Sequence, residues 1–404
     1  MSLRTRRSAL TVSATTALLL LAACGSPGAG GASPSGATAF VIGYAGGLSG
    51  MLEGFEKPAL EAAKMAVEDI NRDGGLNGKR VELITQDTKS DIDQGGPAGQ
   101  ALLAKGAGAL LVTADYNFGG GAARAAQAAG VVAVSVGAGS PKFGVQGIGP
   151  LAFTMGTSGA GDGALTAEWA YEKRAARSAY VLLDDTTDYN KDQCRGFQTR
   201  WRELGGVLAG QDTFKNGDAS ISPQITRMKS LPKTPDVIAF CSYAPGGAVA
   251  LGQLRSAGID SLILTNSGMD GTYWFEKSMP ELSGVALPVS ASVWGDDPAE
   301  EVRRFVERYK EKTGSQPQNM YPVLAYAAVQ AIVQAAKESG STKGADMAEA
   351  MNKFTDKQLL IPVSFTKDTH IDVRRPARML VLDQGKWKTD GLRSLKKAPP
   401  LFAE

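Results

Sequence analysis

The residue types that carry most enzyme chemistry are scarce in this chain. Its 404 residues include one histidine, His370, which we expect in a turn. Catalysis of the Ser-His-Asp kind needs a histidine base, and many zinc sites use histidine ligands. Asp184, Asp185 and Asp188 lie close in sequence but lack the spacing of an EF-hand, so we interpret them as solvated loop acids. The sequence therefore predicts no enzyme active site and no metal site.

A glycine-rich stretch, residues 156–163 (GTSGAGDG), has the composition of a phosphate-binding loop. It has neither the G-x-G-x-x-G spacing nor a Walker lysine, so a nucleotide site is not expected. The chain has 43 Lys and Arg residues against 41 Asp and Glu residues, and this balance gives no indication of nucleic-acid binding. We therefore expect no cofactor and no nucleic-acid partner.

The N-terminus has the features of an export signal. Three arginines open it, residues 14–21 are apolar, and this run is too short for a comfortable membrane span. Residues 21–25 (LAACG) resemble a bacterial lipoprotein lipobox, which implies removal of the signal peptide, residues 1–23, and lipidation of Cys24. The alternative is an ordinary secretory signal with an incidental cysteine. Residues 24–38 are rich in small residues and predict a flexible tether, so we expect an extracytoplasmic protein anchored to the cell membrane.

Without residues 1–23 the chain has 381 residues, and its formal net charge of +2 falls to −1 because three arginines are removed. That length exceeds what one hydrophobic core usually organises, so two lobes are expected. Cys194 and Cys241 then remain. In an oxidising compartment they form either a disulfide or two inert buried thiols, and the sequence leaves both alternatives open.

Residues 40–93 contain a strand–helix–strand unit. Residues 40–44 and 79–84 are apolar runs typical of strands, and residues 58–71 carry apolar side chains at helical spacing. Two glycines, Gly74 and Gly75, end the helix. This unit requires a parallel sheet with a right-handed crossover.

The rest of the chain repeats this pattern twice. Strands are predicted at 109–112 and 131–136, with a helix at 122–129 between them, and a second set of alternating elements covers residues 160–265. The pattern changes after residue 284, where two long helices precede a β-pair. The expected fold class is α/β, with two doubly wound lobes.

Residues 42–50 (IGYAGGLSG) and 66–79 (AVEDINRDGGLNGK) resemble the N-terminal signature of type I periplasmic binding proteins, with the branched-chain amino-acid-binding (leucine/isoleucine/valine) class closest in style. The resemblance covers about residues 40–388. Weaker matches follow in the same order at Asp87, 184–189, 361–365 (IPVSF) and 384–387 (QGKW). It implies two Rossmann-like lobes joined by three crossovers. The implied boundaries are residues 39–156 plus 288–361 for lobe 1, 157–287 plus 362–394 for lobe 2, and 395–404 for a C-terminal tail.

The resemblance also implies a function. The family captures a small solute by closure of two lobes and presents it to the permease subunits of an ABC importer. The expected protein is therefore a lipid-anchored substrate-binding protein and not an enzyme. The alternative is a ligand-sensing receptor subunit of the same fold without an importer.

The family reads the α-carboxylate and α-amino group of an amino acid from two loops of lobe 1. These match Asp115-Tyr116-Asn117 and Ala138-Gly139-Ser140. Further binding positions are carried over from the opening loop, lobe 2 and the last crossover: Leu48, Ser49, Phe55, Tyr189, Tyr243, Ser267, Asp270 and Trp294. At Ser267 or Asp270 the family's amino-acid binders often carry an acid that pairs with the ammonium group.

The first loop precedes the predicted helix at 122–129, so free backbone N–H groups there could hold an anion. This favours an amino-acid-like or carboxylate-bearing solute. The loop departs from the family, however, because Asp115-Tyr116-Asn117-Phe118 replaces a hydroxyl-rich segment. The aromatic side chains of this chain indicate a larger, flatter or more apolar ligand, aromatic solutes included: Tyr116, Phe118, Tyr189, Tyr243 and Trp294.

Overall fold

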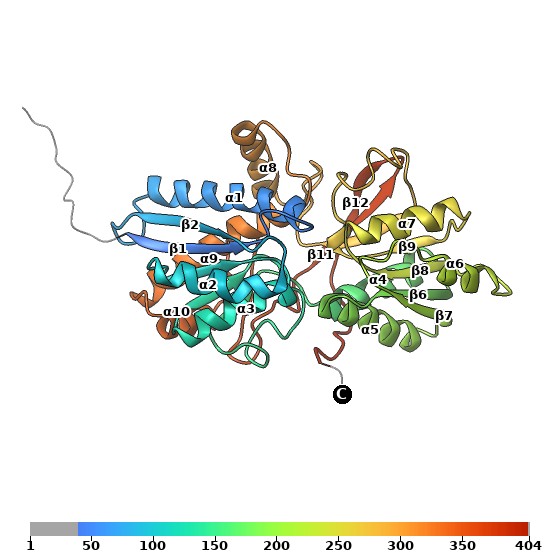
Figure 1. Cartoon of the computed structure of the whole chain (residues 1–404), viewed down its shortest axis with the longest axis horizontal. Helices are drawn as coiled ribbons and strands as arrows, with labels where there is room; N and C mark the ends of the chain where they lie inside the picture. Colours follow the sequence, from blue (N-terminus) through green and yellow to red (C-terminus); the bar gives the residue numbers. More distant parts are fainter. Residues whose placement is uncertain (1–38, 403–404) are drawn as a thin grey trace, which may run out of the picture. The chain divides into compact units, whose positions relative to one another are not determined.

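The computed structural model describes residues 39–402, which form one compact unit. The predicted signal peptide, Cys24, the tether up to residue 38 and the last two residues of the tail lie outside the described residues. The described part is built on two sheets, one of five strands and one of seven (Figure 1).

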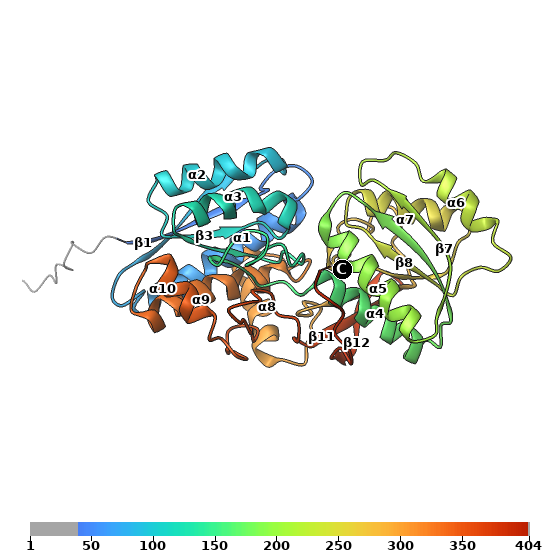
Figure 2. The same cartoon turned by 90° about the horizontal axis from the view of Figure 1, so that it is seen from below.

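The first sheet has the order β2-β1-β3-β4-β5, and all its strands are parallel. The strands are β1 (Phe40–Gly46), β2 (Val81–Asp87), β3 (Ala109–Val112), β4 (Val132–Ser135) and β5 (Ala152–Thr154). Figure 2 shows α2 and α3 on one face and α1, α9 and α10 on the other. These helices are α1 (Glu53–Arg72), α2 (Gly95–Ala104), α3 (Tyr116–Ala128), α9 (Tyr321–Ser339) and α10 (Gly344–Met351). The 3-10 turn η1 (Ile92–Gln94) precedes α2. Helix α8 (Glu300–Thr313) forms an ion pair with α1. We call this half the first lobe.

The second sheet has the order β12-β11-β10-β9-β8-β6-β7, and β11 is antiparallel to both of its neighbours, β10 and β12, while the other pairs are parallel. Its strands are β6 (Ser178–Asp184), β7 (Val207–Phe214), β8 (Val237–Cys241), β9 (Leu262–Leu264), β10 (Val285–Val289), β11 (Ala377–Asp383) and β12 (Lys386–Arg393). Its helices are α4 (Gly159–Lys173), α5 (Asp188–Glu203), α6 (Ser222–Lys229) and α7 (Gly246–Ser256), with the 3-10 turn η2 (Ser267–Met269) after β9. We call this half the second lobe.

The chain passes between the lobes three times: after β5, after β10 and before β11. Two predicted boundaries need correction. Pro288 belongs to the second sheet rather than lobe 1, because β10 continues to Val289 and pairs with β11. The last crossing comes later than residue 362, because the His370 ring stacks on Phe153 of β5 and the Thr154 N–H donates to the His370 carbonyl.

The glycine-rich stretch at 156–163 serves helix packing. A Cβ atom on Gly163 of α4 would lie 1.9 Å from the Gln193 carbonyl oxygen of α5, and one on Gly196 of α5 would lie 2.0 Å from that of Ala160. The two helices therefore pack backbone to backbone. On the same side of the second sheet, Cys194 of α5 is joined by a disulfide to Cys241 at the end of β8.

The predicted helix started at Pro58, but helix α1 begins five residues earlier, at Glu53. Pro58 lies inside the helix and has no N–H to donate to the Gly54 carbonyl, four residues back. Asn319, a fully buried residue just before α9, fills this gap, because its Nδ2 donates to the Gly54 oxygen at 3.2 Å. The start of α1 is thus completed by a residue distant in the sequence.

Helix α3 begins at Tyr116, six residues before the predicted start at 122. Asp115 is its N-cap, with an extended backbone and a side chain that accepts hydrogen bonds from the N–H groups of Asn117 and Phe118. Aspartate is among the preferred residues at this position. Tyr116 and Asn117 are therefore helical and not part of a loop.

Candidate ligand-binding site

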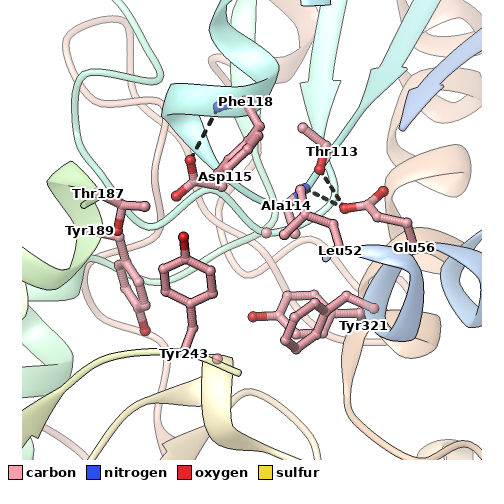
Figure 3. Close-up of a pocket in the computed structure, with 13 residues that line it drawn as sticks. Leu52, Glu56, Thr113, Ala114, Asp115, Phe118, Thr187, Tyr189, Tyr243 and Tyr321 are labelled. Carbon is pink, nitrogen blue, oxygen red and sulfur yellow. Dashed lines mark hydrogen bonds between the residues drawn. The ribbon is translucent and has the colours of Figure 1, made fainter. Parts of the chain in front are cut away.

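Residues of both lobes surround a cavity of about 50 Å³ (Figure 3). Its lining is formed by the starts of α1, α3 and α9, the ends of β3 and β4, and three loops of the second lobe: Leu52, Phe55, Glu56, Thr113, Ala114, Asp115, Phe118, Gly137, Thr187, Tyr189, Tyr243, Gly268 and Tyr321. One buried water needs about 10–15 Å³ on this scale. The cavity thus accommodates a molecule with the volume of roughly three to five waters.

Glu56 holds the first-lobe wall in place. Its side chain is 1% exposed, and its two carboxylate oxygens accept hydrogen bonds from the hydroxyl groups of Tyr44 and Thr113 and from the Ala114 N–H. Burial raises the pKa of Glu56, while the hydrogen bonds from these donors lower it. Because Thr113 and Ala114 lead directly into Asp115, Glu56 positions the start of α3.

Asp115 faces the cavity. Its Oδ1 accepts the N–H groups of Asn117 and Phe118 at 2.7 and 3.2 Å. Its Oδ2 has no hydrogen-bond partner among residues 39–402 and points away from the helix (Figure 3). Burial raises the pKa of Asp115 to about 6. The physical argument for an anion at this helix start fails, because the carboxylate of Asp115 already occupies the free N–H groups.

The opposite wall carries tyrosines from both lobes. Tyr189 of α5 donates its hydroxyl to Asp162 at 2.8 Å, and burial raises the pKa of Asp162 to about 7. The Ser267 hydroxyl lies 3.3 Å from the hydroxyl oxygens of both Tyr189 and Tyr321. Ser267 therefore links a second-lobe tyrosine to a first-lobe tyrosine. The Tyr243 hydroxyl points toward Asp115 (Figure 3).

Four of the predicted binding residues line the cavity, namely Phe55, Asp115, Tyr189 and Tyr243, as does Phe118. In the opening loop, Leu48 and Ser49 do not line it, because the Leu48 N–H and the Ser49 hydroxyl donate to Asp87. These two bonds fix the loop that leads into α1.

The second predicted loop of the first lobe also does not line the cavity. Gly137 does, but Ala138 is fully buried, and its N–H donates to Ser135 Oγ. Gly139 is covered by Tyr189, since a Cβ atom there would lie 2.4 Å from that ring. Ser140 instead donates its hydroxyl to Asp192 of α5 at 3.1 Å, which is a contact between the lobes.

Tyr116 and Asn117 lie outside the lining as well, because they belong to the first turn of α3. The Tyr116 ring lies about 6 Å from the charged groups of Arg124 and Lys142. The Asn117 side chain accepts the N–H of Asp188 across the lobes at 3.0 Å. Both residues serve contacts around the site rather than inside it.

Asp270 and Trp294 do not reach the cavity. Asp270 is fully buried and accepts the N–H of Met320 at 2.8 Å, so it fixes the start of α9 and thereby Tyr321. Trp294 is partly buried against the hydrophobic core. The predicted lobe-2 acid is therefore occupied by the backbone, and the acid that faces the cavity is Asp115 of the first lobe.

Sequence reasoning missed eight lining residues: Leu52, Glu56, Thr113, Ala114, Gly137, Thr187, Gly268 and Tyr321. All of them except Tyr321 lie within three residues of a predicted position. Glu56 carried one usable signal, since it is an acid next to Phe55 on the buried face of an amphipathic helix. Tyr321 had none, because it reaches the site only through the packing of α9.

The prediction that the acids of the 184–188 loop are solvated is wrong for Asp184. Asp184 is fully buried and accepts hydrogen bonds from Thr186, Asn216 and Ser242. Within residues 39–402, no group of three or more His, Cys, Asp or Glu residues is arranged to hold a metal ion. In the same part of the chain, no helix is both long and apolar enough to cross a membrane.

Residues 40–386 match the family described as periplasmic binding protein. Leu/Ile/Val-binding protein homolog 1 of Brucella abortus (strain 2308) is 24% identical over 298 residues, which cover 72% of this chain and 76% of that protein. Because the family match covers most of the chain, the predicted family is confirmed.

Two solved structures show the same fold. One is LivJ, the substrate-binding protein of a branched-chain amino acid transporter from Streptococcus pneumoniae, in complex with isoleucine. It has a TM-score of 0.77 at 24% identity and covers 89% of this chain and 100% of that one. The other is a solute-binding protein of an ABC transporter from Rhodopseudomonas palustris BisB5, in complex with 3,4-dihydroxybenzoic acid. It has a TM-score of 0.76 at 19% identity and covers 89% of this chain and 99% of that one. The predicted fold class is thereby confirmed, and these relatives bind solutes rather than catalyse reactions. The chain belongs to the periplasmic binding protein family, with its two lobes arranged around one small cavity.

Proposed function

We propose that this protein is an extracytoplasmic substrate-binding protein of an ABC importer, anchored to the membrane through lipid on Cys24, which captures a small solute between its lobes. The observation that carries the proposal is the cavity itself, since its walls come from both lobes. A solute bound there is enclosed when the lobes approach, and the closed form is what a permease receives.

Contacts between the lobes support capture by closure. Lys142 of the first lobe forms an ion pair with Asp188 of the second at 2.8 Å, and Ser140 donates to Asp192. Both contacts lie beside the cavity. The Lys142 side chain is about half exposed to water, whereas Ser140 is fully buried. A solvent-exposed ion pair such as Lys142–Asp188 contributes about 0–1 kcal/mol, so this contact alone adds little to the stability of the closed form.

The size of the cavity favours a solute no larger than an amino acid. A molecule with the volume of three to five waters occupies about 100–150 Å³. The relatives described above hold isoleucine and 3,4-dihydroxybenzoic acid, which are solutes of this scale. The predicted amino-acid-like solute remains part of the proposal on grounds of size and family.

Native mass spectrometry of the protein purified from its own cells tests capture. A single small molecule should accompany the folded chain and leave on denaturation, and adding it back should stabilise the protein and compact it in solution scattering. If no solute from the cell extract produces either change, capture is refuted.

Membrane anchoring and the importer need separate tests. Cys24→Ser should release the protein from the membrane fraction without altering ligand binding. A permease and an ATPase that co-purify with the ligand-bound protein favour an importer. Ligand-dependent association with a signalling protein instead would favour the receptor alternative.

A further inference from the structure

The charges around the cavity have one sign. Of its thirteen lining residues, two are carboxylic acids, Glu56 and Asp115, and none is Lys, Arg or His. Lys142 lies outside the lining and is engaged with Asp188. The ligand therefore meets negative charge and no positive side chain.

The two acids differ in what they have left to offer. Glu56 accepts three hydrogen bonds from protein donors and is 1% exposed, so its carboxylate is satisfied before a ligand arrives. Asp115 has used only Oδ1, on the first turn of α3, and its Oδ2 is directed into the cavity. Asp115 is half-buried, so water can reach this oxygen until a ligand covers it, and covering it is costly unless the ligand supplies a donor.

Aromatic rings provide the rest of the environment. Five line the cavity with Asp115, and three of them are tyrosines: Phe55, Phe118, Tyr189, Tyr243 and Tyr321. The faces of such rings are electron-rich and attract ammonium and guanidinium groups, most strongly when water is excluded. Acid and rings together match a cation with a small apolar body.

We propose that Asp115 is the residue that recognises the solute, that the group it recognises is a cationic nitrogen such as an ammonium or amidinium, and that the solute needs no carboxylate. This inference rests on the proposed function and refines it by naming the ligand chemistry. The ammonium donates to Asp115 Oδ2 while the rings cover its apolar part. A carboxylate placed beside Asp115 would meet a like charge with no cation to offset it.

Matched probes test this assignment on the full folded chain. Leucine, 3-methylbutylamine and 4-methylpentanoate share one branched apolar body. Leucine carries both charges, 3-methylbutylamine only the ammonium and 4-methylpentanoate only the carboxylate. Benzylamine and benzoate form an aromatic pair. Each is titrated by calorimetry at pH 7.5, with thermal shift as a second readout.

The amines are expected to bind at least as tightly as leucine, and the two acids at least tenfold more weakly than the amines. Asp115→Asn keeps the acceptor for the α3 N–H groups but removes the charge, so amine affinity should fall about 10- to 100-fold. Asp185→Asn, a change of equal charge outside the lining, is the control and should leave affinity unchanged. Circular dichroism checks that all variants fold.

Opposite preferences would overturn the inference. Binding of 4-methylpentanoate or benzoate with the amines inert would exclude Asp115 as the recognition residue, while capture itself would stand. Amine binding that is equal in the wild type and Asp115→Asn would do the same. If none of the five probes binds, the solute identified by native mass spectrometry tests the inference. A solute without a cationic nitrogen would refute the inference but not the proposed function.

Discussion

The interaction of Asn319 with α1 leads to a quantitative prediction. Pro58 leaves the Gly54 carbonyl without its helical donor, and Asn319 Nδ2 supplies one. The same side chain accepts the Tyr321 N–H through Oδ1 at 3.1 Å. Asn319→Ala therefore orphans one acceptor in α1 and one donor at the start of α9.

Each orphaned group costs about 1–3 kcal/mol. We expect Asn319→Ala to lower the free energy of unfolding by about 3 kcal/mol. In a Pro58→Ala background, position 58 regains an N–H that reaches the Gly54 carbonyl, so only the Tyr321 donor is lost. The same Asn319→Ala change should then cost about 1–2 kcal/mol less, which is the coupling energy of the pair.

Guanidinium unfolding, followed by tryptophan fluorescence, gives this coupling energy from the wild type, the two single variants and the double variant. Lys57→Ala, an exposed neighbour of Pro58, is the control and should be additive with Asn319→Ala. Additivity of Pro58→Ala and Asn319→Ala within about 0.5 kcal/mol would refute the compensation.

Three further predictions follow from buried groups. Glu56→Ala should lower the free energy of unfolding by roughly 3 kcal/mol, because three donors lose their acceptor, and Glu56→Gln by only about 1 kcal/mol; equal losses in chemical denaturation would contradict this role. Burial raises the pKa of Asp115 to about 6, with Asp188 and Glu56 adding to the shift, so the folded state binds this proton more tightly than the unfolded state. The contribution of Asp115 to apoprotein stability should therefore rise as pH falls from above 6 toward 4, and Asp115→Asn should be more stable than wild type at pH 7.5 but not at pH 4; a pH-independent difference in melting temperature would argue against it. The disulfide Cys194–Cys241 spans a sequence separation of 47 residues, so replacing both cysteines by serine should lower stability by about 4 kcal/mol through the entropy of the unfolded chain, and an unchanged denaturation midpoint would count against a bridge.

The sheet strands were predictable because their apolar runs are short, continuous and bounded by glycine. The first residues of the helices were less predictable. The predicted helix started at Pro58, and the first turn is the commonest helical position of proline, yet the helix extends further toward the N-terminus, where Asn319 replaces the missing donor. The three glycines at 119–121 obscured α3, although Asp115 carried a correct N-cap signal.

The binding site was predicted in part for a related reason. Residues directly after strands or at helix starts, such as Asp115, Tyr189 and Tyr243, were predicted from the family resemblance, and the predicted sheet pattern places them near one another. Whether a side chain enters the cavity depends on contacts over long sequence distances. Asp270 is held by Met320, and Tyr321 is placed by the packing of α9. No local pattern contains this information.

The bridge from Ser267 to Tyr189 and Tyr321 makes the pocket wall a property of both lobes. The wall is complete only while the lobes are together, so a measured dissociation constant includes the fraction of molecules that are already closed. Substitutions at the crossings, far from the solute, will thus change apparent affinity by shifting that fraction. Solute release will in turn be timed by the opening of the lobes rather than by the strength of any single contact.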